Sequence, residues 1–237
     1  MRGRELRYVC VGQMELVVAP EDARCPVAYL VDSVEHPLAT QLDNVARNMA
    51  IVRIPVHDWN DALTPWPAAG LYRGEPDFGG NAATTLAELV DEAMPATEEK
   101  WGLVPQGRAV CGYSLGGLFS VYAFVNGAFD ACACLSGSLW YEGWTDYMHR
   151  ASANLDGTFA YLSVGAKERR AARPILKGVQ RNTEECVSVL EQLGCSVRYA
   201  VVPGGHFEHV GQRLAAGLDA LAQFFDSTAA DRARNER

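Results

Sequence analysis

Short apolar runs alternate along this chain with segments whose apolar positions recur at helical spacing. Seven runs have the length and β-branched content of strands, and they cover 7–18, 27–32, 49–56, 108–113, 131–137, 159–165 and 197–204. The first run predicts an opening strand or hairpin, and the others are almost continuously apolar. That pattern is typical of central strands in a parallel sheet covered by helices on both faces.

Helical periodicity fills several of the intervals. Three predicted helices have an apolar stripe. The first stripe is Leu86, Leu89, Val90 and Met94; the second is Val179, Cys186, Leu190 and Leu193; the third is Leu214, Leu218, Leu221 and Phe225. Asn81 is a favourable N-cap for the first, and Gly194 ends the second. The sequence therefore predicts a single α/β domain over 1–226, with a mostly parallel central sheet and a frayed polar tail over 227–237.

Composition and charge narrow the choice of partners. The chain has 237 residues, 49% of them hydrophobic, which suits one globular domain. Its 21 Lys+Arg against 29 Asp+Glu give a formal net charge of −8, so its field repels nucleic acid and anionic membrane surfaces. The uncharged stretch 109–129 is long enough to span a membrane, but its glycines and serines favour a buried strand, turn and helix. We predict neither a nucleic-acid nor a membrane partner.

Cysteine usage indicates a reducing compartment. The seven cysteines are an odd number and lie mostly in apolar runs, where a thiol behaves as a small hydrophobe. The first residues lack the apolar core of a signal peptide, so we expect a cytoplasmic protein. Cys132 and Cys134 form CxC without a second Cys or His cluster at zinc-ligand spacing, so we expect no metal site. A homo-oligomer is compatible with the sequence.

The stretch "VCGYSLGGLF" carries the strongest chemical signal. Gly112, Ser114 and Gly116 form the pattern G-x-S-x-G between a predicted strand and the helix-like run "LGGLFSVYAFV". A nucleophile elbow requires this context, with small residues two positions either side of a strained serine. The amide of Leu115, at the helix N-terminus, would then face a developing oxyanion.

A serine nucleophile needs a base, which in this type of fold follows it in the chain. His206, after a strand and two glycines in "VVPGGHFEHV", suits that role, and His209 is the second choice. An acid is expected after an intervening strand. Glu168 in "YLSVGAKERR" has that position, and Glu142 in "LWYEGW" competes with it. Either carboxylate could orient the imidazole.

An irregular segment, residues 57–80, has the composition of a substrate loop. It contains three prolines, four glycines and two tryptophans and shows no sustained period. Trp59, Trp66 and Arg73 of this segment, together with Trp140 and Tyr141 of "SGSLWY", are the substrate-binding residues that we expect. A loop that only packs its own aromatic side chains is the alternative.

Five stretches in order along the chain, "VAYLVD", "CGYSLGGLFSVYA", "LSGSLWY", "YLSVGAKE" and "VPGGHF", resemble the esterase branch of the α/β-hydrolases. That branch contains enterochelin (siderophore) esterases, esterase D-like proteins and mycolyltransferase-like proteins. The resemblance implies the α/β-hydrolase fold, Ser114 as nucleophile, His206 as base and residues 136–141 as a wall of the site. It places a second oxyanion amide near Ser33 or Val34. The stretch "LVDSVEHP" lacks the tryptophan-glycine type of sequence found in the enterochelin enzymes, and no separate N-terminal domain is expected.

Together these features predict a serine carboxylic-ester hydrolase that acts on a small-molecule ester without a metal or organic cofactor. Ser114 would form an acyl-enzyme, with His206 as base and Glu168 as orienting acid. An acyltransferase, in which an alcohol replaces water, has the same sequence requirements. A catalytically inactive hydrolase fold used for binding is the alternative from another functional class.

Overall fold

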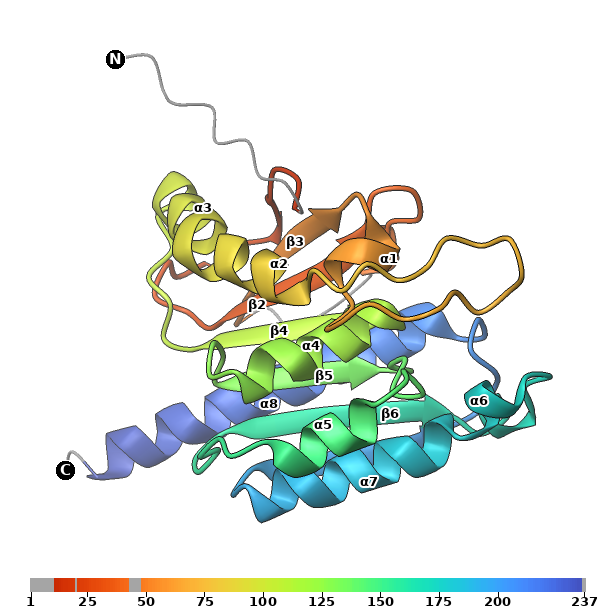
Figure 1. Cartoon of the computed structure of the whole chain (residues 1–237). Coiled ribbons are helices and arrows are strands. Elements are labelled where there is room, and N and C mark those ends of the chain that lie inside the picture. Colours follow the sequence, from red (N-terminus) through yellow and green to blue (C-terminus); the bar gives the residue numbers. More distant parts are fainter. Residues whose placement is uncertain (1–10, 20, 43–47, 236–237) are drawn as a thin grey trace.

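The computed structural model describes residues 11–19, 21–42 and 48–235 of the chain (Figure 1). Seven strands form one sheet in the order β1-β3-β2-β4-β5-β6-β7. They are β1 (Glu15–Val18), β2 (Val27–Ser33), β3 (Ala50–Val56), β4 (Arg108–Tyr113), β5 (Ala131–Leu135), β6 (Phe159–Gly165) and β7 (Ser196–Val202). Only β1 is antiparallel to its neighbour, so the predicted α/β fold with a mostly parallel sheet is confirmed.

Helices cover both faces of the sheet (Figure 1). On one face lie α2 (Ala82–Glu88), the π-helical turn η2 (Leu89–Ala93), α3 (Met94–Trp101), α4 (Leu115–Val125), α5 (Trp144–Arg150) and α7 (Val179–Gln192). The long helix α8 (Val210–Asn235) covers the other face. The short helices η1 (Ala39–Gln41), α1 (Trp59–Ala62), η3 (Glu168–Arg170) and α6 (Pro174–Lys177) lie in connections between the larger elements.

The strands are apolar on both faces because each face has its own core. In β2, Val27, Tyr29 and Val31 belong to the cluster under α2–α7, while Ala28 and Leu30 belong to the cluster under α8. Successive residues of a strand point to opposite faces, so a strand that helices cover twice is apolar throughout. The sheet thereby gives its carboxyl edge, where β4 and β6 end, a rigid support.

The structure differs from the sequence-based expectation at the C-terminus. We expected a frayed tail from residue 227, but α8 continues to Asn235. The side chains of Ser227 and Thr228 donate to the Phe224 carbonyl, and Arg234 pairs with Asp231 at 3.1 Å. Alanine and arginine are good helix formers, so the polar composition does not end the helix here.

Two further expectations have mixed outcomes. Residues 7–10 of the opening run lie outside the described residues, and the rest forms β1 and a bridge from Val11 to Val56. Asn81 directly precedes α2, but its amide donates to both carboxylate oxygens of Asp61, at 2.9 Å each, instead of capping the helix.

In the described part of the chain, no helix is long and apolar enough to cross a membrane.

Candidate active site

Ser114 stands on the sharp turn between β4 and α4. Its backbone has φ 57° and ψ −121°, a left-handed conformation that costs a non-glycine residue about 1–3 kcal/mol. The turn brings Gly112 against Gly116, where a Cβ on Gly112 would lie 2.3 Å from the Gly116 carbonyl carbon. Only glycine fits at position 112, and the close approach lifts the Ser114 side chain out of the carboxyl edge of the sheet.

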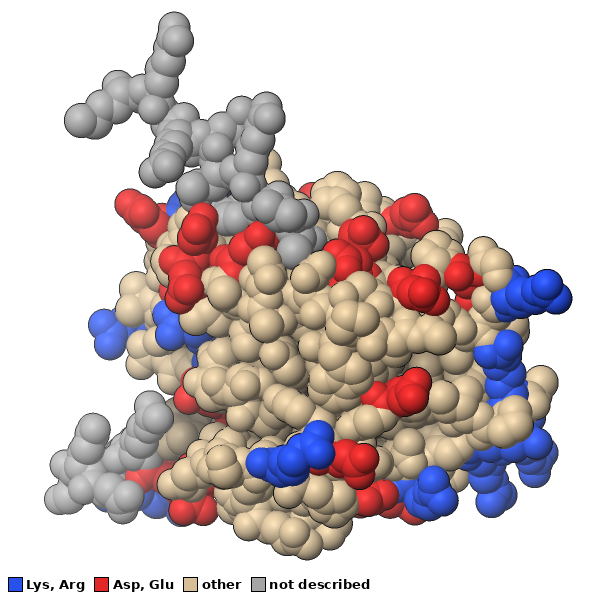
Figure 2. Space-filling view, in the orientation of Figure 1, with Lys and Arg blue, Asp and Glu red and all other residues tan. Residues whose placement is uncertain are grey.

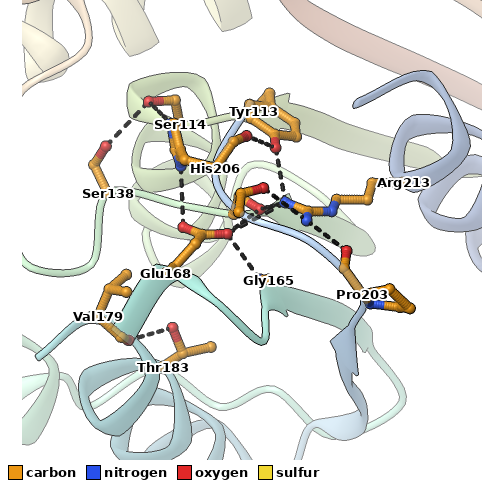
Figure 3. Close-up of polar contacts among 12 residues, drawn as sticks. Tyr113, Ser114, Ser138, Gly165, Glu168, Val179, Thr183, Pro203, His206 and Arg213 are labelled. Atoms are coloured by element: carbon orange, nitrogen blue, oxygen red, sulfur yellow. Dashed lines mark hydrogen bonds and ion pairs between the residues drawn. The ribbon is translucent and has the colours of Figure 1, made fainter. Parts of the chain in front are cut away.

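Three predicted residues meet at this edge (Figure 3). His206 Nε2 lies 3.1 Å from Ser114 Oγ, and His206 Nδ1 lies 3.0 Å from Glu168 Oε2. They come from the elbow after β4, the loop after β7 and the η3 turn after β6. An imidazole in this position can accept the serine proton on one nitrogen while a carboxylate holds the other.

The surroundings of Glu168 decide which nitrogen of His206 carries the proton. Burial raises the pKa of the Glu168 carboxyl, but hydrogen bonds from His206, Gly165 and Ser136 and the charge of His206 more than offset burial, so its pKa lies below the ordinary value. An ionised carboxylate only accepts hydrogen bonds. His206 Nδ1 therefore carries the proton toward Glu168, and Nε2 of the neutral ring is left to accept from Ser114.

Arg213, in the first turns of α8, connects the parts of the site and was not identified from the sequence. It is 3% exposed, and its Nη1 donates to Tyr113 Oη (2.9 Å), Ser136 Oγ (2.6 Å) and Glu168 Oε1 (3.2 Å). Its Nη2 donates to the carbonyls of Pro203 (3.0 Å) and Gly205 (2.9 Å), in the loop that carries His206. Figure 3 shows the guanidinium between Tyr113, Glu168 and Pro203.

A signal for Arg213 was present in the sequence. Gly217 and Ala220 follow it by four and seven residues, and both lie on the buried side of α8. An arginine in line with small residues, next to an apolar stripe, indicates a helix side that packs closely on a sheet. What the arginine meets there depends on the sheet order.

The amides expected to face an oxyanion are those of Leu115 and of Ser33 or Val34. Leu115 is the first residue of α4, and the N–H of a first helical residue has no acceptor within its helix. Of the two amides expected at the end of β2, that of Val34 donates to the Val56 carbonyl at 3.3 Å. Ser33 lines the same pocket as Ser114 and His206, so its amide is the better placed of the pair.

The segment 136–141 surrounds Ser114 from the β5 side. Ser138 Oγ lies 3.3 Å from Ser114 Oγ, and the Ser138 amide donates to the Ser114 carbonyl at 2.9 Å. Ser136 Oγ donates to Glu168 Oε1 at 2.8 Å. The wall that the resemblance implied therefore contacts both Ser114 and Glu168. The Ser114 hydroxyl has the Ser138 hydroxyl and the His206 ring as neighbours.

Two pockets open on either side of Ser114. The Trp140 pocket has a volume of about 460 Å³, and among its lining residues are Tyr72, Trp140, Arg170 and Leu176. The Trp59 pocket, of about 390 Å³, is lined on its far side by Asp32, Ser33, Glu35 and Trp59. Ser114, His206 and Phe207 line both pockets. Phe207 is 89% exposed and lies edge-on to His206, so its ring borders both pockets.

A hollow of about 650 Å³ lies elsewhere, lined by Asn126, Tyr147 and Arg150 among others. It is larger than either pocket, but α4 begins directly after Ser114 and ends at this hollow, so the hollow lies at the opposite edge of the sheet. Neither Ser114 nor His206 lines it. The paired pockets, and not this hollow, are the candidate substrate site.

The remaining predicted substrate residues lie outside both pockets. Trp66 donates from Nε1 to the Glu142 carbonyl (2.9 Å), and its own carbonyl accepts from the Tyr141 hydroxyl (2.5 Å). Their rings pack together, so this pair braces the 57–80 loop against the wall of the site. Arg73 is exposed and lines neither pocket. Of the five expected side chains, Trp59 and Trp140 face the pockets.

The competing acid and base occupy other positions. Glu142 is exposed, whereas Glu168 contacts His206. His209 has φ 59° and precedes α8, where its carbonyl accepts from the Arg213 amide at 3.1 Å. Within the described ranges, no three His, Cys, Asp or Glu side chains are grouped so that they could hold a metal ion.

Several known proteins are similar to this chain. The Bacillus subtilis (strain 168) protein named "Uncharacterized protein YbbA" is 31% identical over 150 residues, which are 62% of this chain and 60% of that protein. The chain thus aligns with less than two thirds of that relative's length.

Solved structures share the fold. An IroE-like serine hydrolase from Shewanella oneidensis superposes with a TM-score of 0.68 at 18% identity, over 89% of this chain and 74% of that one. The siderophore hydrolase EstA from Aspergillus nidulans gives a TM-score of 0.68 at 18% identity, over 90% and 89% of the two chains. The family model described as "Putative esterase" matches residues 12–216. That match covers most of the chain and confirms the resemblance noted in the sequence: the protein belongs to this esterase family, with the fold of the α/β-hydrolases.

Proposed function

We propose that this protein hydrolyses a carboxylic ester of a small molecule through an acyl-enzyme on Ser114. The observation that carries the proposal is the continuous path from Ser114 Oγ through the His206 ring to Glu168, with distances of 3.1 and 3.0 Å. Membership in an esterase family supports the reaction class. The Shewanella oneidensis protein of similar fold is named a serine hydrolase, which agrees with the choice of nucleophile.

In the first step Ser114 Oγ attacks the ester carbonyl carbon while His206 Nε2 takes the hydroxyl proton. The carbonyl oxygen becomes an oxyanion, which the amides of Leu115 and Ser33 would stabilise. When the tetrahedral intermediate collapses, the bond to the alcohol oxygen breaks and His206 passes its proton to that oxygen. The acyl group remains on Ser114.

In the second step a water molecule attacks the acyl carbon, and His206 again serves first as base and then as acid. The water oxygen becomes part of the released carboxylic acid, and the proton returns to Ser114 Oγ. Glu168 stays ionised throughout, which keeps the imidazole in the required orientation and stabilises its protonated form.

A fluorophosphonate probe tests the nucleophile directly. The wild-type protein should form a covalent adduct that peptide mass analysis places on Ser114, and Ser114→Ala should form none. Ser138→Ala is the matched control, because it removes a hydroxyl 3.3 Å from Ser114 Oγ and leaves the proposed nucleophile in place. A wild-type protein that resists labelling would instead favour an inactive hydrolase fold used for binding.

Product analysis separates the hydrolase from an acyltransferase. With a simple ester in buffer, the acid and the alcohol should form in equal amounts. Added acceptor alcohol should leave the acid as the main product. A new ester as the main product would reassign the second step to alcohol transfer.

A further inference from the structure

The charge around the two pockets is unequal. The chain carries 21 Lys+Arg and a net charge of −8, yet six of those cations lie between residues 167 and 181. They are Lys167, Arg169, Arg170, Arg173, Lys177 and Arg181, here called the basic segment, and all but the half-buried Arg173 are exposed. Figure 2 shows Lys and Arg gathered along the edge of the molecule where α6 lies in Figure 1.

The basic segment borders the Trp140 pocket. Lys167 and Arg170 line that pocket, beside the apolar side chains of Leu71, Trp140 and Leu176. The acid within the segment, Glu168, is buried and bound by His206 and Arg213. Its charge is therefore already balanced inside the protein, so the rim of the pocket is net positive.

Few protein anions neutralise these cations. Lys167 pairs with Glu208 at 3.1 Å, through two exposed side chains. Among the described residues, Arg169, Arg170, Arg173, Lys177 and Arg181 form no ion pair. Arg173 instead lies over the Tyr72 ring at 4.4 Å, which ties the basic segment to the 57–80 loop across the pocket. Unpaired guanidinium groups at a pocket rim attract anions and focus their field into it.

The Trp59 pocket has the opposite character. Asp32 and Glu35 line it together with His36, and none of the lining residues that the structure describes is Lys or Arg. Asp32 is paired with Arg53 at 2.9 Å, whereas Glu35 is exposed. A negatively charged group would be repelled from this side of Ser114 and attracted to the other.

We propose that the Trp140 pocket selects esters that carry a carboxylate, or a comparable anionic group, on the half of the molecule that fills it. This inference rests on the proposed function, because Ser114 must be the reacting residue between the two pockets. Arg170 would bind the anion, the rest of the basic segment would attract it, and the neutral half of the ester would occupy the Trp59 pocket. The apolar side chains around Arg170 suit an anionic group on an aromatic or bulky body.

Two matched pairs of esters test the inference on the full-length protein. Methyl 4-carboxybenzoate and methyl 4-carbamoylbenzoate differ by one charge on the acyl side, and 4-carboxyphenyl butyrate and 4-carbamoylphenyl butyrate differ on the alcohol side. In at least one pair, we expect the carboxylate to have a kcat/KM about tenfold higher or more. This ratio should fall as salt is added, since screening weakens the attraction.

Variants identify the group responsible. Arg170→Ala should remove most of the preference by lowering kcat/KM for the carboxylate ester more than for the carbamoyl ester, whereas Arg170→Lys should keep part of it. Arg150→Ala is the matched control, because it removes an exposed arginine at the opposite edge of the sheet. Equal rates within both pairs, or a preference that survives Arg170→Ala, would overturn the inference but not the proposed function. No turnover of any of the four esters would overturn the proposed function, and this inference with it.

Discussion

Replacing Glu168 by glutamine should nearly abolish ester hydrolysis, because the two carboxylate oxygens have different hydrogen-bond partners. Oε1 accepts from the Gly165 amide (2.7 Å), Ser136 Oγ (2.8 Å) and Arg213 Nη1 (3.2 Å), whereas Oε2 accepts from His206 Nδ1 (3.0 Å). A glutamine has one oxygen and one NH2 group. The three donors require the oxygen on their side, so the NH2 group must face His206.

The consequence is an imidazole in the wrong tautomer. Nδ1 would have to accept from the glutamine NH2, and the proton of the neutral ring would move to Nε2, which faces Ser114. Nε2 could then not take the serine proton. In a serine protease, the corresponding change from carboxylate to amide lowers kcat by about 10⁴, and we expect a loss of that order here.

The same change should cost stability, because Arg213 would lose its buried carboxylate partner. Breaking a buried pair costs about 3–5 kcal/mol, and the lower figure applies here because the amide oxygen still accepts. For a chain of this length, that corresponds to a fall in Tm of about 6–12 °C. Steady-state hydrolysis, measured well below the Tm of the variant, separates the two effects.

Glu142→Gln is the control for this experiment. Glu142 follows the neighbouring strand β5 but is exposed, so its variant should keep both the wild-type kcat and the wild-type Tm. Folded Glu168→Gln protein that retains more than about a tenth of the wild-type kcat, or a larger effect of Glu142→Gln, would refute the assignment of Glu168.

Four further measurements bear on the site. Ser114→Ala should lower kcat by about 10⁶ with little change in Tm; substantial residual hydrolysis would contradict it. The pKa of Glu168 is lowered in the folded protein, so its ionised form stabilises the protein at pH values above the ordinary carboxyl pKa of about 4.3. The difference in Tm between the wild type and Glu168→Gln should therefore narrow as the pH falls below that value. A constant difference would count against an ionised, paired Glu168. Arg213→Met should lower kcat, since Glu168 and the loop that carries His206 would lose their shared donor, while Arg213→Lys should restore part of it; equal kcat values in both variants at equal Tm would limit Arg213 to a structural role. Aromatic or bulky esters should react faster than acetate esters, and Trp140→Ala should reduce that preference, which comparison of kcat/KM would check.

The sequence by itself determined the elements and the nature of the chemistry. Strands buried on both faces are apolar throughout, so six of the seven runs match strands of the sheet to within a few residues. The elbow was readable because its constraint is local: Gly112 and Gly116 must be small for the chain to double back beside Ser114. His206 and Glu168 were identified as candidates because each stands in a loop directly after a predicted strand and follows Ser114 in the chain.

Only the tertiary structure decided which side chains meet. Glu168 and Glu142 both follow strands, and the choice between them depends on the order β5-β6-β7, which puts the Glu168 turn beside the His206 loop. Trp66 and Tyr141 have the composition of substrate residues but pack on each other, because aromatic side chains serve a core and a pocket equally well. Arg213 is separated from its partners Tyr113 and Glu168 by 100 and 45 residues. No local pattern records such a contact, since its energy comes from burial and from partners that the fold alone brings together.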